Sequence, residues 1–264
     1  MRRGAIGFLD ALGFKGIWHR HSPEDVLTKL RELQVGSQRI IESFQNERGK
    51  MAMPSNTTPW LDIAFLSDTV VIAATVDGAA ADVQNDWACI LLASFASSAI
   101  LSLGAKCSPA FAYRGCVSLG SFEMAYPFVV GAAVDEAAEN ERAAEGAIVW
   151  FAPSAEAAIQ RAVKEIGPRA RESPAWMPWN VPLKGGRTYR TFAVTPLFPG
   201  HLDSAYSPSH GDVEVVSEQI LKTFGTSDLD HPLPLSIVLK RQNTADFLEE
   251  AAIRIARSTS TACG

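Results

Sequence analysis

The stretch Ala88–Ala105 carries no charged residue over about the length of a bilayer span. Its many alanines and four hydroxyl side chains lower its hydrophobicity below that of an ordinary membrane helix; these are Ser94, Ser97, Ser98 and Ser102. A helix that is apolar on all sides is stable when the rest of a fold covers it. We therefore predict a buried core helix, from Asp82 to about Gly104, and no membrane span.

Length, charge and cysteine usage narrow the class of protein further. The 264 residues suffice for one large domain, or for one domain with an appendage. A net charge of −5 gives no basic footprint for nucleic acid. An acidic chain that binds an anionic nucleotide needs cations or metal ions at the site itself. The four cysteines lack CxxC spacing, and no signal peptide is evident, so we expect a cytoplasmic protein with free, mostly buried thiols.

Hydrophobic periodicity predicts an α+β fold. Strand, helix and hairpin signals follow one another in the order β-α-β-β-α-β, and then αβ-αβ, which indicates a mixed sheet with helices on one face. The strands are predicted at Gly4–Asp10, Trp60–Leu66, Thr69–Val76, Pro109–Leu119, Ala147–Phe151, Val181–Leu183 and Tyr189–Val194. The helices are predicted from Ser22 to about Asn46, at Ala132–Glu145, Pro153–Gly167, Asp212–Phe224 and Asn243–Arg257, with a loop at Arg169–Asn180. Residues 1–195 then form the main domain, and residues 196–264 form a helical extension.

Two carboxylates lie where this order of elements brings chain segments together. Asp10 ends the first strand and precedes a tight turn over Ala11–Phe14. Asp68 lies at the tip of the predicted hairpin, beside Ser67. Two like charges so close together repel unless cations neutralise them, and two divalent ions suit phosphoryl chemistry. The alternative is that each is an ordinary solvated aspartate at a strand end or turn.

Five motifs in sequence order carry a resemblance. The segments are Phe8–Phe14, Phe65–Val71, Tyr113–Gly120, Gly131–Glu139 and Leu183–Gly185. Through these segments, residues 4–195 resemble a class III nucleotidyl cyclase domain, and most closely the Pycsar pyrimidine cyclases of bacterial antiphage defence. The resemblance implies a ferredoxin-like catalytic domain, a homodimer with active sites at the subunit interface, and two Mn²⁺ or Mg²⁺ ions. It also implies that a nucleoside triphosphate is cyclised to a 3′,5′-cyclic monophosphate.

The resemblance also assigns roles to individual residues. Asp10, Ala11 and Asp68 are the expected metal ligands, and Asp10 and Asp68 the expected catalytic carboxylates. The backbone N–H groups of Leu12, Gly13 and Phe14 are expected to hold the phosphates.

Departures from the family pattern bear on the substrate. Ala64 stands where adenylate cyclases carry a purine-selecting lysine, and Asp135 and Glu139 stand where they carry asparagine and arginine. These losses argue against ATP and GTP and agree with a pyrimidine substrate, but they do not choose between UTP and CTP. We expect UTP, with CTP as the alternative. Arg114 is the leading substitute for the missing arginine, because a guanidinium grips phosphate bidentately; the alternative is a structural ion pair. Arg142 is expected to pair with Glu139.

Two further side chains are candidate substrate contacts, each with a structural alternative. Trp60 is placed to stack on a base or to pack in the core or an interface. Lys184 is placed to reach substrate or to close its hairpin. Because Asp135 and Glu139 are acidic, a catalytically silent nucleotide-binding module and a dimerising scaffold stay open as rivals to a uridylate cyclase.

Overall fold

One eight-stranded sheet organises the chain in the computed structural model, which describes residues 1–14, 17–19, 21–46, 57–78, 82–126, 128–196, 212–225 and 232–261. Its strands lie in the order β2-β3-β1-β4-β6-β8-β7, and β5 pairs with β4. In that order they span Thr57–Leu66, Thr69–Gly78, Arg2–Ala11, Tyr113–Ala125, Val149–Phe151, Arg187–Val194 and Trp176–Leu183, with β5 at Phe128–Val130. The β4–β6 pair is parallel and all the other pairs are antiparallel.

The first half of the sheet has the ferredoxin-like topology. β1, α1 (Pro23–Asn46), β2, β3, α2 (Asp82–Lys106) and β4 follow in sequence, and their strands lie in the order β2-β3-β1-β4. The predicted α+β class is therefore confirmed. Ser22 caps α1 as predicted, because its Oγ accepts a hydrogen bond from the Asp25 N–H at 3.1 Å.

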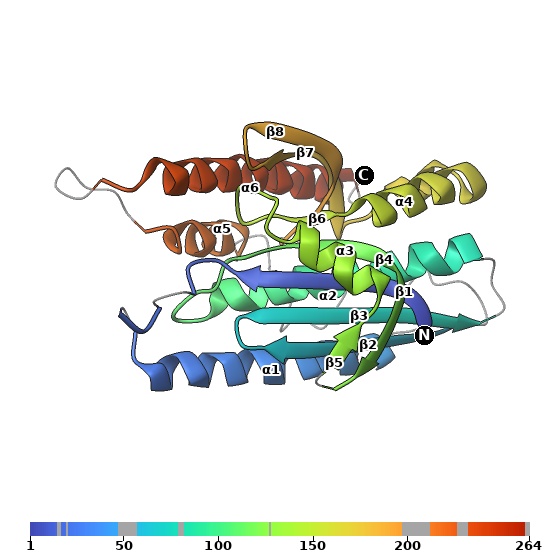
Figure 1. Ribbon diagram of the computed structural model, residues 1–264. Coiled ribbons are helices and arrows are strands. Elements are labelled where there is room, and N and C mark those ends of the chain that lie inside the picture. Colours follow the sequence, from blue (N-terminus) through green and yellow to red (C-terminus); the bar gives the residue numbers. More distant parts are fainter. Residues whose placement is uncertain are drawn as a thin grey trace.

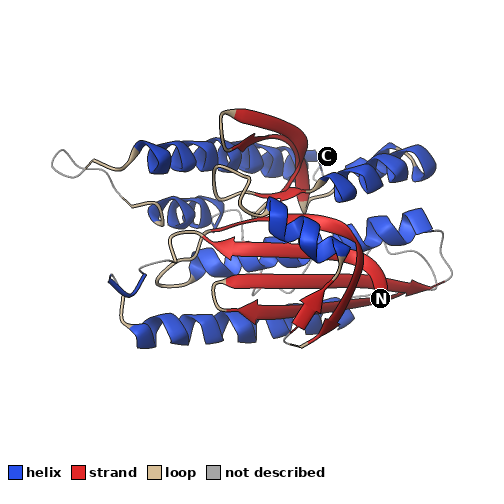
Figure 2. Cartoon of the chain, viewed as in Figure 1, coloured by secondary structure: helices blue, strands red, loops and turns tan. Residues whose placement is uncertain are grey.

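Helices cover both faces of the sheet, and not one face as the sequence predicted (Figures 1 and 2). Side chains alternate between the faces along β1, so that Leu9 joins one buried cluster and Ile6 the other. The Leu9 cluster includes residues of α1, α2 and α4 (Pro153–Ile166). The Ile6 cluster includes residues of α3 (Ala132–Asn140), α5 (Asp212–Lys222) and α6 (Leu235–Thr261). The predicted C-terminal extension thus shares a core with the sheet.

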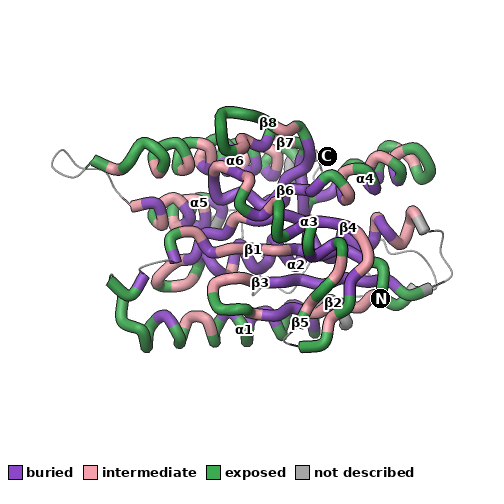
Figure 3. Tube along the Cα trace, in the orientation of Figure 1, coloured by how far each residue is buried: buried purple, intermediate pink, exposed green. Residues whose placement is uncertain are grey.

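Helix α2 is the buried core helix that its composition predicts (Figure 3). Among the described residues, one segment is long and apolar enough for a membrane span, Val83–Lys106 of α2, and 89% of its most apolar window is buried in the fold. Its buried hydroxyls are used internally. Ser98 and Ser102 donate to the carbonyls of Thr195 and Pro196, which ties the end of β8 to α2.

Several predicted boundaries were wrong. Strand β4 begins four residues later than expected and runs to Ala125, and α3 ends at Asn140 and not at Glu145. The predicted loop Arg169–Asn180 contains a 3-10 turn, η2 (Pro168–Arg171), and the start of β7. Helix α6 begins eight residues before the predicted start, at Leu235. A second 3-10 turn, η1 (Ile17–His19), precedes α1.

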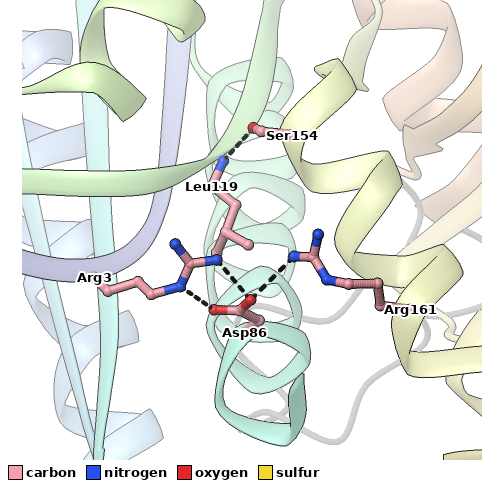
Figure 4. A network of polar contacts seen from close by, with 5 residues as sticks. All are labelled: Arg3, Asp86, Leu119, Ser154 and Arg161. Carbon is pink, nitrogen blue, oxygen red and sulfur yellow. Dashed lines mark hydrogen bonds and ion pairs between the residues drawn. The ribbon is translucent and has the colours of Figure 1, made fainter. Parts of the chain in front are cut away.

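An ion-pair network holds one end of the fold together (Figure 4). The carboxylate of Asp86 on α2 accepts two hydrogen bonds from Arg3 of β1, at 2.7 and 2.8 Å, and one from Arg161 of α4, at 3.3 Å. Beside it, Ser154 Oγ accepts the Leu119 N–H of β4 at 2.8 Å. Three elements that are far apart in sequence are thereby fixed to one another.

Candidate active site

The end of β1 brings Asp10 beside both neighbouring strands. Asp10 lies opposite Thr69 of β3 and opposite Arg114 of β4. The next residue, Ala11, donates its N–H to the carbonyl of Asp68 at 3.1 Å. The backbones that carry the two predicted metal carboxylates therefore meet at one edge of the sheet, on the left in Figure 1.

The turn that carries Asp68 is strained. Ser67 and Asp68 form the two-residue connection between β2 and β3, as predicted, and Ser67 has a φ of 64°. A positive φ at the first turn residue is normally taken by glycine, because a Cβ atom costs free energy there. Such strain is often stored at functional sites, and here it lies next to the candidate carboxylate.

Arg114 pairs with Asp10 across the strands. The Arg114 Nη2 atom lies 3.1 Å from Asp10 Oδ2, and each side chain is 13% exposed. In this structure the guanidinium is hydrogen-bonded to Asp10 Oδ2, an oxygen that a cation bound to Asp10 would also contact. The structural ion pair, one of the two roles that the sequence allows for Arg114, is therefore present.

The turn after β1 is built partly as expected. Gly13 has a φ of 72°, which glycine adopts without strain, and Phe14 anchors the turn by packing against Trp18 and Phe111. The Leu12 N–H, however, donates to the carbonyl of Ala112 at 2.7 Å. The expectation that this amide holds phosphate is thus not met in this structure, because the amide is already paired inside the chain.

A small cleft of about 160 Å³ opens beside this turn. Leu12 and Gly13 line it, together with His21 and with Lys222 of α5. The C-terminal extension therefore borders the segment that the sequence assigns to the phosphates.

The structure adds a third carboxylate that the sequence interpretation missed. Glu141, directly after α3, is 4% exposed, and its Oε1 accepts a hydrogen bond from Arg142 Nε at 2.5 Å. Burial raises the pKa of the Glu141 carboxyl, and the charge of Asp10 raises it further, while Arg142 and Arg114 act in the opposite direction. A sequence signal existed, because Glu141 continues the buried helical spacing of Val134 and Ala137.

Cations surround these carboxylates. The sequence predicted that Arg142 pairs with Glu139, and this was wrong. Arg142 pairs with Glu141, because α3 ends before this residue. The bond to Glu141 raises the pKa of Arg142, and Asp10 and Asp68 add to the effect. Partial burial, and then the charge of Arg114, lower the pKa of Lys184, which lies in the β7–β8 turn.

Trp60 is not brought to this edge of the sheet. It lies opposite Thr75 of β3, six residues beyond the partner of Asp10, which is about 20 Å along the strand. The Arg2 guanidinium covers its ring at 4.9 Å. Within one chain, Trp60 therefore does not contact a ligand held by Asp10 and Asp68.

The donor set at the edge suits divalent magnesium or manganese. Within the described ranges, no group of three or more His, Cys, Asp or Glu side chains is placed to hold one ion. Magnesium sites commonly use one or two carboxylates, and the phosphates of the substrate and waters supply the remaining ligands. Asp10 and Asp68, whose backbones meet through the hydrogen bond from Ala11, fit such an ion.

Comparisons with known proteins identify similar solved structures but no family. No family model and no curated protein match the chain. Among solved structures, it is similar to the catalytic core of a rhodopsin-guanylyl cyclase with converted specificity in complex with ATPαS. The identity is 15%, the match covers 73% of this chain and 94% of that chain, and the TM-score is 0.46. A likeness at this level carries no functional conclusion.

Proposed function

We propose that the chain is a uridylate cyclase that converts UTP to 3′,5′-cyclic UMP and pyrophosphate. The observation that carries the proposal is the meeting of Asp10 and Asp68 at adjoining strand ends, with Arg114 bonded to Asp10. The order of five cyclase-like motifs along residues 4–195 supports it independently. The resemblance further suggests a second-messenger step in antiphage defence, in the cytoplasm.

In the proposed reaction, the ribose 3′-hydroxyl attacks the α-phosphorus in line with the departing pyrophosphate. The new O–P bond closes the cyclic phosphate, the bond to the β-phosphate oxygen breaks, and the hydroxyl proton leaves to solvent. Two Mn²⁺ or Mg²⁺ ions would lower the pKa of the hydroxyl and stabilise the leaving group. Asp10 and Asp68 would hold these ions, and Arg114, Arg142 and Lys184 would offset the charge of the triphosphate.

The choice of a pyrimidine substrate rests on what the chain lacks. Ala64 stands in place of the purine-selecting lysine of adenylate cyclases, and it is fully buried in β2. Asp135 and Glu139 are exposed on α3, in place of the asparagine and arginine of adenylate cyclases. CTP is the alternative substrate. The two acids also favour a second candidate function, a catalytically silent nucleotide-binding module, which would bind UTP without releasing pyrophosphate.

A homodimer is part of the proposal. The β4–β5 hairpin projects apolar side chains into solvent, with Tyr126 66%, Phe128 73% and Val130 59% exposed. A second copy of the chain would cover this arm. Light scattering should give a dimer mass for the wild type and a monomer mass for Phe128→Ser.

Single substitutions at the two carboxylates test the proposed function. Asp10→Ala and Asp68→Ala should each lower pyrophosphate release from UTP by at least about a hundredfold, because each removes a metal ligand. Asp77→Ala is the matched control, since Asp77 is an exposed aspartate near the far end of β3. Wild-type rates in both site variants would refute the proposal.

A further inference from the structure

Two buried atoms near the candidate site lack hydrogen-bond partners, and they are chemically complementary. Within the described part of the chain, Arg114 Nε is a donor without an acceptor, and Glu141 Oε2 is an acceptor without a donor. Such atoms are costly to leave unpaired in a folded protein, and they commonly mark a second arrangement or a ligand. Glu141 is 4% exposed, so water does not readily satisfy it.

The path of α3 places Glu141 toward Arg114. Ala133, at the start of α3, lies against Gly120 of β4, and its carbonyl accepts a hydrogen bond from Ser118 Oγ. Ala137, one turn before Glu141, packs in the same buried cluster as Cys116 of β4. The helix therefore follows β4 from its middle toward the strand end that carries Arg114.

Electrostatics agree with this placement. The charges of Asp10 and Arg114 both act on the Glu141 carboxyl, in opposite directions. Glu141 uses Oε1 for Arg142, which leaves Oε2 for another donor. Arg114 thus has two carboxylates near it, Asp10, to which it is hydrogen-bonded in this structure, and Glu141, whose charge it influences.

We propose that Glu141 is a positioning residue that takes over the Arg114 guanidinium when Asp10 binds a divalent cation. The cation then gains the Asp10 oxygen that Arg114 holds in this structure, and the guanidinium stays buried and paired. This inference rests on the proposed function, because it presumes that Asp10 is a metal ligand. It assigns Glu141 a role through Arg114 and no direct contact with substrate.

A stability cycle, in which the unfolding of single and double variants is compared in EDTA, tests without metal whether Arg114 moves from Asp10 to Glu141. Asp10→Ala removes the present acceptor, so Arg114 should turn to Glu141. Glu141→Gln should then lower the folding equilibrium constant about tenfold in the Asp10→Ala background, and by no more than about threefold in the wild-type background. Urea unfolding of the full chain measures both. Equal effects in the two backgrounds would overturn the proposal.

Binding of Mn²⁺ alone, followed by electron paramagnetic resonance of the free ion, tests the consequence for the metal. Glu141→Gln should weaken Mn²⁺ binding about tenfold, because Arg114 then has no second acceptor. Glu165→Gln, at an exposed position on α4, is the control and should bind as the wild type does. Equal affinity in Glu141→Gln and wild type would overturn the exchange. If the wild type binds no Mn²⁺ alone, the same titration is run with UTP present. Binding in neither case would refute the proposed function, and the stability cycle still decides whether Glu141 receives Arg114.

Discussion

Breaking the Asp10–Arg114 ion pair should reveal how strongly the two side chains depend on each other. Each side chain is 13% exposed, so most of the water that would screen the pair is absent. Removing one partner of a buried pair costs about 3–5 kcal/mol, since the other charge stays buried. We expect Arg114→Met to cost about 3 kcal/mol, because Asp10 and Glu141 then repel without the intervening cation.

Asp10→Ala should cost less, about 2 kcal/mol, because Arg114 keeps Glu141 as an acceptor. The double variant should be more stable than the sum of the two losses predicts, by about 2 kcal/mol, since no unpaired charge remains. Urea unfolding at pH 7 in EDTA measures all four proteins. Additive losses would refute the reasoning, because they would mean that the two side chains do not interact in solution.

Three further changes test other features of the structure. Ser67→Gly should raise the free energy of unfolding by about 0.5 kcal/mol, seen as a higher urea midpoint, because glycine adopts a positive φ without strain but loses more chain entropy. Asp86→Ala should lower it by about 2 kcal/mol, and more than Arg161→Ala does, because Arg3 also loses its acceptor. The pKa of Glu141 is raised in the folded chain. The protonated carboxyl therefore contributes its full stabilisation below about pH 4, the ordinary pKa range of glutamate. This stabilisation is lost as the pH rises through the pKa of Glu141 in the folded chain. The stability difference between Glu141→Gln and wild type should therefore shift in favour of Glu141→Gln as pH rises above about 4 in urea titrations. A difference that does not change with pH would contradict the assignment.

The sequence predicted the parts of the fold that local patterns specify. The two-residue spacing between the β2 and β3 runs identified the hairpin, and the charge-free run identified the core helix α2. The meeting of Asp10 and Asp68 followed from topology, because β1 of a β-α-β-β unit commonly lies beside the hairpin.

Other elements depend on their tertiary setting. The first part of β7 was predicted as a loop because Arg169–Asn180 is rich in proline and tryptophan. Pro178 lies in β7, which is the edge strand of the sheet, where a missing N–H is tolerated. Helices α3, α5 and α6 were predicted, but the face of the sheet that they cover was not, because local periodicity does not say which face a helix covers. Helix α6 starts directly after Pro234, whose carbonyl accepts the Ile237 and Val238 N–H groups.

In the candidate site, too, some features follow from local sequence and others depend on tertiary contacts. The meeting of Asp10, Asp68 and Arg114 agrees with the prediction from their motifs, whereas Glu141 was missed because its burial depends on the elements packed around it. The pairing of Arg142 was wrong because it assumed that α3 continues beyond Asn140. Trp60 was misplaced because its distance from Asp10 is set by strand register, which the sequence does not state.

Incubation of the full chain with ATP, GTP, CTP and UTP, each with Mn²⁺, tests the central claim most directly. Mass spectrometry of the products identifies any cyclic monophosphate by its base. The account predicts cyclic UMP as the main product in the wild type and its loss in Asp10→Ala and Asp68→Ala. No cyclic product from any of the four triphosphates would contradict it.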